Sequence, residues 1–275
     1  MKSLKNATVD GIATVLSNSH YCYKMAKLII MKRDNDCNAN MLYNGEKKIV
    51  DFLIEKNLLN VFIDVGANVG DYLSMVLEHN KPFDICIYAF EPGPRNVEIL
   101  RKRFSDMSNL TIVSKALSDI EGPMDFFQNV DPQMAGSDSI HDMQKIGYDY
   151  VTTKHSVEAI TLDKFCEQNG INHVSLMKCD VEGNELAVFM GGRGMIMKGA
   201  IDYIQFEFGH AARAARVFLY DIYNFLHGCK YEMFTVKPRG LEKFVYSPWE
   251  ENKYNMINFF AVSNKSINTV QKIII

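Results

Sequence analysis

The sequence lacks several signals that mark whole classes of protein. No apolar run approaches the length of a membrane-spanning helix, about 18 residues. The six cysteines include no C-x-x-C pair and no spacing typical of a metal site, which favours reduced thiols. The net charge is −3, so no overall basic excess attracts a nucleic acid or an anionic membrane. We therefore expect a cytoplasmic protein with no membrane-spanning segment and no nucleic acid partner.

The chain also lacks internal repeats, low-complexity tracts and any linker rich in proline, glycine and serine. Its 275 residues, of which 47% are apolar, suffice for one large folded domain. We expect residues 1–56 to form a helical cap that belongs to the same domain. Residues 57–263 are predicted to be the main domain, and residues 264–275 a frayed tail.

What the sequence does contain is a predicted strand, tight turn and helix start at residues 61–77. Apolar residues surround Asp64 in the strand, and Gly66 and Gly70 bracket the next three residues. The free N–H groups of a helix start favour a polar ligand in such a turn. The spacing is G-x-x-x-G and not the G-x-G-x-x-G of dinucleotide sites. Asp64 would repel a pyrophosphate, but it suits an ammonium group such as that of S-adenosylmethionine.

Two further strand ends complete a predicted cofactor site. Glu91 ends the second strand, 21 residues after Gly70 (91 − 70), where an acceptor for a ribose diol is expected. A third strand, residues 110–119, ends in a polar turn whose Leu117 and Ser118 could hold an adenine ring. An ordinary strand-to-turn junction is the alternative for that last turn. From the cap, Tyr43 and Glu46 could touch the ligand, although solvated or packing roles are favoured.

Carboxylates gather at the ends of the fourth and fifth predicted strands. The period of two along a strand puts Lys178, Asp180 and Glu182 on one side, and Glu207 ends the neighbouring strand. Alternating polar residues at the carboxyl end of a strand are typical of a site. Between two short strands, residues 129–155 are long, polar and rich in hydrogen-bonding side chains, which favours a mobile lid over the acceptor site.

Strands that alternate with helical segments predict an α/β fold with a mostly parallel sheet covered by helices on both faces. The seven main strands are expected at residues 61–65, 84–91, 110–119, 174–183, 200–208, 231–236 and 256–262. The last two have no room between them for a long helix, so we expect the final strand to be antiparallel. The helices are expected at residues 47–56, 95–104, 161–170, 184–192 and 211–226.

Several of these segments resemble motifs of the FkbM family of S-adenosylmethionine-dependent methyltransferases. The resemblance covers residues 43–262 and leaves the first 40 residues outside it. It rests on residues 62–70 (FIDVGANVG), 90–94 (FEPGP), 116–119 (ALSD), 161–163 (TLD), 178–185 (KCDVEGNE) and 206–208 (FEF). It implies a Rossmann-like class I methyltransferase fold with strand order 3-2-1-4-5-7-6 in residues 57–263.

The resemblance also implies a cofactor, a reaction and several site residues. Asp64, Gly66, Asn68 and Gly70 match the cofactor loop of the family, and Glu91 matches its ribose carboxylate. The implied reaction is O-methylation of a hydroxyl on a sugar or natural product. In folds of this type, the residue at the position of Asp180 faces the transferred methyl group.

An alcohol is a poor nucleophile, so a base or a metal ion must assist its methylation. The main base candidates are Asp180, Glu207 and His141. Glu182 and His210 are further candidates. Alternatively, Asp180, Glu182 and Glu207 could share a Mg²⁺ ion that holds a sugar diol. Acidic groups with hydroxyl and imidazole partners suit a neutral polyol, so we expect a sugar hydroxyl as acceptor.

Other functions stay open at this point. A methyltransferase that modifies nitrogen on a protein or a small amine would need a similar cofactor site. So would a binding module that holds S-adenosylmethionine without catalysis. A nicotinamide-dependent oxidoreductase is disfavoured because the dinucleotide fingerprint is missing. The sequence does not indicate an oligomeric state.

Overall fold

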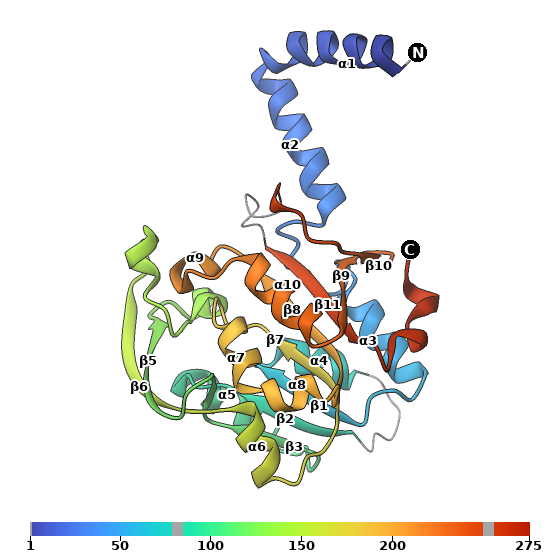
Figure 1. Ribbon diagram of the computed structural model, residues 1–275. Helices are drawn as coiled ribbons and strands as arrows, with labels where there is room; N and C mark the ends of the chain where they lie inside the picture. The colour runs from blue at the N-terminus through green and yellow to red at the C-terminus, as the bar shows by residue number, and fades with distance from the viewer. Residues whose placement is uncertain (1, 79–84, 250–255) are drawn as a thin grey trace.

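A computed structural model describes residues 2–78, 85–249 and 256–275. In this structure eight strands form one twisted sheet in the order β10-β9-β11-β8-β7-β1-β2-β3 (Figure 1). A smaller sheet has the order β4-β6-β5. The strands are β1 (Val61–Val65), β2 (Cys86–Phe90), β3 (Leu110–Val113), β4 (Ala116–Leu117), β5 (Gly122–Asn129), β6 (Thr152–Ile160), β7 (Val174–Cys179), β8 (Ile201–Phe208), β9 (Tyr231–Lys237), β10 (Gly240–Lys243) and β11 (Ile257–Ser263).

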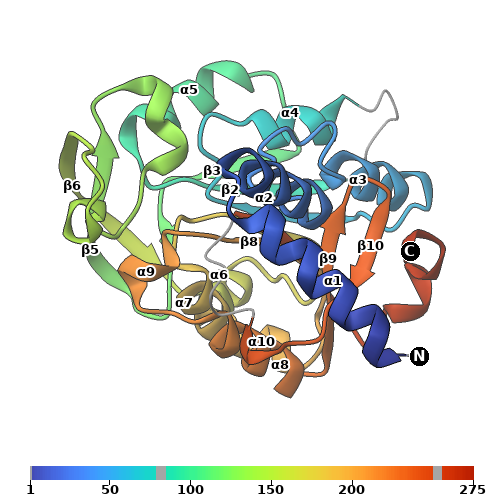
Figure 2. The same cartoon turned by 90° about the horizontal axis from the view of Figure 1, so that it is seen from above.

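Helices cover both faces of the large sheet (Figure 2). The α-helices are α1 (Lys2–Ser17), α2 (His20–Asp34), α3 (Glu46–Glu55), α4 (Asp71–Leu77), α5 (Pro94–Arg103), α6 (Leu162–Gln168), α7 (Glu185–Gly191), α8 (Arg193–Met197), α9 (Ala212–Ala215) and α10 (Leu219–Gly228). The 3₁₀ helices include η1 (Pro132–Ser137), η2 (Met143–Ile146), η4 (Ile267–Thr269) and η5 (Gln271–Ile273).

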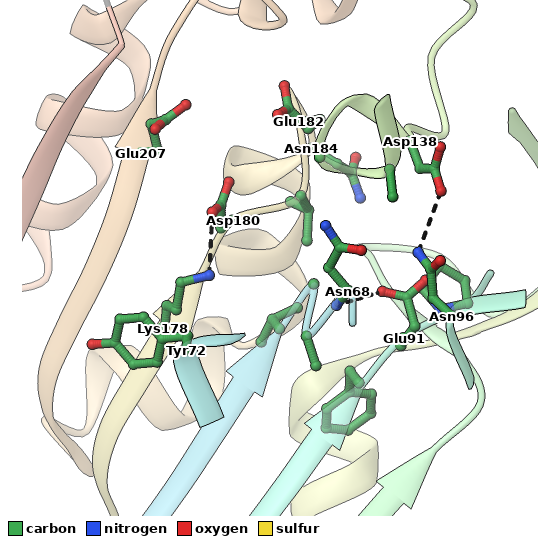
Figure 3. A pocket seen from close by; sticks show the side chains of 18 of the residues that line it. Asn68, Tyr72, Glu91, Asn96, Asp138, Lys178, Asp180, Glu182, Asn184 and Glu207 are labelled. Carbon is green, nitrogen blue, oxygen red and sulfur yellow. Dashed lines mark hydrogen bonds and ion pairs between the residues drawn. The ribbon is translucent and has the colours of Figure 1, made fainter. Parts of the chain in front are cut away.

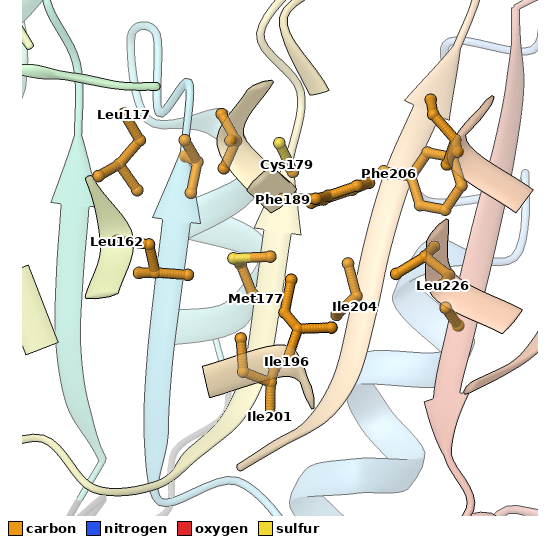
Figure 4. Packing of buried hydrophobic residues seen from close by; sticks show 14 of the residues in the cluster. Leu117, Leu162, Met177, Cys179, Phe189, Ile196, Ile201, Ile204, Phe206 and Leu226 are labelled. Carbon is orange, nitrogen blue, oxygen red and sulfur yellow. The ribbon is translucent and has the colours of Figure 1, made fainter. Parts of the chain in front are cut away.

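The core consists of two apolar layers, one on each face of the sheet. Helices α3 and α4 pack on one face, and α6, α7, α8 and α10 pack on the other. Strand β8 serves both layers, because successive side chains alternate: Ile204 and Phe206 belong to one layer and Tyr203 to the other (Figure 4). A parallel sheet buried on both faces needs such apolar strands, and this explains the apolar runs in the sequence.

The sheet confirms the predicted strand order and the antiparallel last strand. Strand β1 pairs in parallel with β2 and β7, and β11 runs antiparallel to both β8 and β9. The sequence did not predict the edge strand β10, a short strand that pairs with β9. Its Leu241 is fully buried and packs with the layer that carries α3.

Two predicted elements are divided in the structure, and a third is followed directly by a further helix. Residues 110–119 form two strands in different sheets, β3 and β4, and β4 pairs with β6. The helix predicted at 184–192 continues as a second helix, α8, after Gly192. The helix predicted at 211–226 is interrupted by Arg216, whose φ of 57° ends α9 before α10 begins.

The predicted N-terminal cap behaves as two parts. Helix α3 packs on the sheet through Ile49, Val50, Leu53 and Ile54. Helices α1 and α2 instead project from the body as an arm (Figure 1), and α2 has no buried residue. None of the described helices combines the length and the apolar character that crossing a bilayer requires.

The C-terminal tail is folded and not frayed, which corrects the expectation for residues 264–275. Val270 is fully buried, Ile273 is 8% exposed, and the amide of Ile275 donates to the carbonyl of Leu241. The tail therefore covers the part of the core beside strand β10.

This packing predicts an asymmetric effect of two matched substitutions in the tail. Ile273→Ala should lower the free energy of unfolding by about 2–5 kcal/mol, because it removes a buried side chain and leaves a cavity. Ile275→Ala, at a position that is 61% exposed, should change it by no more than about 0.5 kcal/mol. Chemical denaturation of both variants measures the difference, and equal stabilities would mean that the tail does not pack in solution.

Candidate functional site

A pocket of about 280 Å³ opens at the carboxyl ends of β1, β2, β7 and β8 (Figure 3). This edge of an open α/β sheet is where ligands bind in such folds. Of the predicted site residues, the pocket lining includes Gly66, Asn68, Glu91, Leu117, Asp180, Glu182 and Glu207. The remaining ones are Asp64, Gly70, Ser118 and His141, and they lie outside the lining.

The glycine turn after β1 shapes the floor of the pocket. Gly66 has a φ of 81°, and a Cβ at this position would overlap the carbonyl oxygen of Asp180. Only glycine lets the end of β7 approach the turn this closely. Gly70 plays a different part from the one expected, because a Cβ there would strike the Phe104 ring and not a ligand. Gly70 therefore allows close packing of α4 against the region after α5.

Glu91 is fixed at the end of β2 by two backbone donors. Its carboxylate accepts hydrogen bonds from the amides of Asn68 at 2.9 Å and Gly93 at 2.8 Å. Burial raises the pKa of Glu91 to about 7, although these two donors act in the opposite direction. A ligand hydroxyl that donates to Glu91 would favour the charged form further.

A buried cluster of charges lies at the centre of the sheet. The pairing register places Asp64 beside Lys178 and Lys178 beside Gln205 on neighbouring strands. The Lys178 ammonium is 3.2 Å from Asp180 and 3.9 Å from Asp64. Burial lowers the pKa of Lys178, but attraction to Asp180, Asp64 and Glu46 outweighs it and raises the pKa.

Asp64 lies beneath the pocket wall, and Lys178 and Glu46 contribute to the wall itself. Both carboxylate oxygens of Asp64 are buried without a hydrogen-bond partner among the described residues. Burial raises the pKa of Asp64 to about 6, although Lys178 lowers it. A ligand that brings a cation to this wall would therefore stabilise a charge that the protein leaves underpaired.

Glu46 reaches the pocket through a chain of polar contacts that starts at α4. The Tyr72 hydroxyl donates to Gln205 at 2.9 Å, and the Gln205 amide donates to Glu46 at 2.5 Å. The Lys178 ammonium lies 5.0 Å from the centre of the Tyr72 ring. These hydrogen bonds fix the side chains of Tyr72 and Glu46, which both line the pocket, and they give Glu46 more than a solvated role. Tyr43, in contrast, is 73% exposed and does not line the pocket.

Three carboxylates converge at the mouth of the pocket. Asp180 and Glu182 follow β7 and Glu207 comes from β8, and one oxygen of each lies within 4.8 Å of the others (Figure 3). Burial, and then the charge of Asp180, raise the pKa of both Glu182 and Glu207 well above the usual range. This cluster of three carboxylates can accept a proton or hold a cation.

The carboxylates converge for a reason that differs from the predicted alternation along a strand. Strand β7 ends at Cys179, and Glu182 has a φ of 51°, so the chain turns between Asp180 and Glu182. The Glu185 side chain holds this turn by accepting from the amides of Val181 at 3.1 Å and Gly183 at 3.3 Å.

Neither candidate histidine reaches the pocket lining in the part of the chain that the structure describes. His141 lies against Gly183, and its Nε2 is buried without a partner among the described residues. Burial lowers the pKa of His141, which favours the neutral imidazole. His210 stacks on Tyr148 with ring centres 5.0 Å apart. A direct role for His141 would require the segment to move.

The predicted adenine turn is present, but its two residues point differently. Leu117 lines the pocket, and its carbonyl accepts from the Asn184 side chain at 3.1 Å. Ser118 is buried and faces away, with its amide donating to Ile160 and its hydroxyl to Asp119. An apolar contact from Leu117 is thus available to a ring, whereas Ser118 supports the turn.

The predicted lid, residues 129–155, is held against the pocket by the side chain of Asp138, a residue that the sequence analysis did not single out. Asp138 accepts hydrogen bonds from the side chains of Arg95, Asn96 and Gln128 and from the amide of Asn129. Its side chain is only 4% exposed. Consequently η1 and the residues after it form part of the pocket wall and include Ala135, Gly136, Asp138 and Ile140.

Comparison with known proteins identifies similar sequences. The sequence model of the methyltransferase FkbM domain matches residues 64–233, which is more than half of the chain. The 2-O-methyltransferase NoeI of Sinorhizobium fredii is 26% identical over 158 residues, 54% of this chain and 63% of that protein. The hexuronic acid methyltransferase AglP of Haloferax volcanii is 25% identical over 150 residues, 54% of this chain and 56% of that protein.

The chain thus spans less than two thirds of the length of either of these curated relatives. Among solved structures, a methyltransferase FkbM from Methylobacillus flagellatus superposes with a TM-score of 0.48 at 14% identity. That match covers 74% of this chain and 44% of the other.

The geometry of Glu91 predicts how the binding of S-adenosylmethionine depends on this residue. Glu91→Ala should weaken binding by about 1–3 kcal/mol, because ribose hydroxyls lose a charged acceptor. Since the carboxylate is the accepting form, binding to the unchanged protein should be full above pH 7 and weaken as the pH falls below it. Calorimetric titration across pH measures both effects. The exposed Glu98→Ala is the control, and unchanged affinity in Glu91→Ala would exclude the ribose role.

The contacts of Asp138 predict how the lid moves. Asp138→Ala leaves several buried donors unpaired, so the Ser139 amide should exchange hydrogen roughly tenfold faster or more. Residues 144–151 should exchange fast in the free protein and slowly once cofactor and acceptor are bound. Hydrogen exchange with mass spectrometry measures both. Asp142→Ala, which affects only the start of η2, is the control; unaltered exchange in Asp138→Ala would show that Asp138 does not hold the lid.

Proposed function

The chain belongs to the FkbM methyltransferase family, and on this premise we propose that it transfers the methyl group of S-adenosylmethionine to a sugar hydroxyl. The observation that carries the proposal is one continuous pocket, which joins Glu91, the glycine turn and the three converging carboxylates. A cofactor-binding half and an acidic half that can accept a proton are the two parts that such a transfer needs.

The cofactor half fits the chemical groups of S-adenosylmethionine. Glu91 accepts from ribose hydroxyls, Leu117 offers an apolar contact to adenine, and the carboxylates of Asp180 and Glu46 in the wall offer acceptors to an ammonium group. The orphaned oxygens of Asp64 and Asn68 agree with a ligand that brings donors and positive charge. When bound, S-adenosylmethionine supplies a methyl group on a positively charged sulfur.

The acidic half provides the proton acceptor. The Asp180 carboxylate is held 3.2 Å from the Lys178 ammonium, which fixes its direction. We assign Asp180 the role of holding the acceptor hydroxyl and taking its proton, with Glu207 as the neighbouring carboxylate. His141 is the alternative base, and it would act only after a movement of the lid.

The acceptor is proposed to be neutral near the reacting hydroxyl. Three carboxylates would repel a nearby carboxylate or phosphate on the acceptor. The names of the two relatives, a 2-O-methyltransferase and a hexuronic acid methyltransferase, agree with a sugar. If the acceptor carries a carboxylate, it must lie away from Asp180, Glu182 and Glu207, or a cation must lie between them.

A divalent cation at these three residues is the second way the site could work. Mg²⁺ prefers oxygen ligands, usually one or two carboxylates with water, and one oxygen of each of the three carboxylates lies within 4.8 Å of the others. In that case Asp180 would be a ligand and not a direct base. Methylation of nitrogen, or binding without catalysis, would leave the cofactor half unchanged, so turnover on a panel of sugars, amines and peptides separates these alternatives.

The role of Asp180 can be tested by removing its charge while keeping its shape. Asp180→Asn should lower kcat by about 10²–10⁴-fold, with the affinity for S-adenosylmethionine largely kept. Asp106→Asn, at an exposed position outside the pocket, should leave both unchanged. Full turnover by Asp180→Asn would remove this residue from the mechanism.

Added EDTA distinguishes a base from a metal ligand at the same site. With Asp180 as a direct base, EDTA should leave turnover of the unchanged enzyme intact. If EDTA abolishes turnover and Mg²⁺ restores it, Asp180, Glu182 and Glu207 act as ligands and the assignment of Asp180 as base is wrong.

A further inference from the structure

The chain has two parts whose net charges have opposite signs, the first 34 residues and the rest. Residues 1–34 contain six basic and two acidic residues, a charge of +4, while the whole chain carries −3. The other residues therefore carry −7 (−3 minus +4). The basic residues of the arm are Lys2, Lys5, Lys24, Lys27, Lys32 and Arg33.

The same arm exposes a dense set of large apolar side chains. Of the exposed large hydrophobic residues in the described chain, ten of 24 lie within α1 and α2. They are Val9, Ile12, Val15, Leu16, Tyr21, Tyr23, Met25, Leu28, Ile29 and Ile30. A patch of this kind on a soluble protein marks a surface that binds something.

Helix α2 exposes apolar side chains on more than one face, and one of these faces carries four of them. Tyr21, Met25, Leu28 and Ile29 follow the i, i+4, i+7, i+8 spacing that puts them on one face. Lys24 and Lys27 lie three residues apart on the adjoining face, and Lys32, four residues after Leu28, lies on the apolar face itself. Exposed apolar side chains beside lysines suit a helix that lies in the surface of an anionic membrane.

The base of the arm lies beside the pocket. Just after α2, Asn35 donates from its side chain to the carbonyls of Asn44 at 2.7 Å and Val236 at 3.1 Å. Ala39 and Met41, a few residues further on, line the pocket. The residues just after the arm therefore form part of the pocket wall.

A second apolar group adjoins this base. Arg33 and Val245 line the same small cavity, and the Cys37 amide donates to the carbonyl of Met256 at 3.1 Å. The chain after β10 reaches the side of the body from which α2 projects (Figure 1). It carries Trp249, the one tryptophan of the sequence, which is 79% exposed. Tryptophan and tyrosine are the aromatic residues enriched at membrane–water interfaces.

We propose that α1, α2 and residues 244–249 dock on an anionic lipid surface and hold the pocket mouth next to it. The positive charge matches the lipid headgroups, and the apolar face enters the boundary of the acyl chains. A coiled coil with a second copy fits less well, because it needs apolar heptads sustained over about three repeats, whereas these helices have 16 and 15 residues. The proposal does not depend on the identity of the acceptor.

Vesicle flotation of the full chain tests this proposal. The protein should float with vesicles of phosphatidylcholine and phosphatidylglycerol, much less with phosphatidylcholine alone, and less at high salt. Each basic residue near an anionic surface strengthens binding roughly fivefold. Lys24→Glu with Lys27→Glu should therefore lower the affinity for these vesicles, measured by flotation, about 25-fold or more. Ile29→Ser with Ile30→Ser should weaken it as well, because it removes apolar contact.

Two matched controls make the result decisive. Lys56→Glu with Lys272→Glu changes the net charge equally at exposed positions of the body and should leave flotation nearly unchanged. Binding of S-adenosylmethionine should persist in the arm variants, which shows that they fold. No flotation of the unchanged chain, or equal loss in the control pair, would overturn the proposal. So would sedimentation showing a dimer that only the arm variants dissociate, without vesicle binding, because the occupant would then be a second copy.

Discussion

The site depends on one buried ammonium group, that of Lys178. It lies between Asp180 at 3.2 Å and Asp64 at 3.9 Å, and the charge of Glu46 also acts on it. Burying several carboxylates without a cation would cost several kcal/mol for each charge. The sheet register that sets Asp64, Lys178 and Gln205 side by side is therefore what makes an acidic pocket compatible with a folded core.

One lysine does not balance all the carboxylates around the pocket. Burial raises the pKa of Asp64 to about 6 and those of Glu182 and Glu207 well above the usual range. Burial without enough balancing cations therefore disfavours the charged form of these carboxylates, and a bound cation would favour it. The proposed cofactor carries positive charge and would supply such a cation.

The sequence predicted those features that local patterns determine. Apolar strands and glycine turns predicted where the strands lie, and the resemblance to the FkbM family implied their order. Strand ends predicted that Glu91, Asp180 and Glu207 meet in one pocket. It missed β10, whose four residues give no periodic signal, and the tail, whose burial depends on Leu241 far from it in sequence. It also missed Asp138, because its role follows from pairing across β5 and α5 and not from its neighbours in the chain.

The net charge of the whole chain hides how charge is distributed along it. A net charge of −3 suggested no attraction to an anionic membrane, yet the arm carries +4 and the remainder −7. Such a separation orients a molecule as it approaches a charged surface, because the arm is attracted while the body is repelled. Since Ala39 and Met41 join the base of the arm to the pocket wall, an encounter that begins at the arm would bring the pocket mouth toward the lipid. In the proposed docking, the attracted arm and the repelled body would thus favour the same orientation of the chain on the lipid surface.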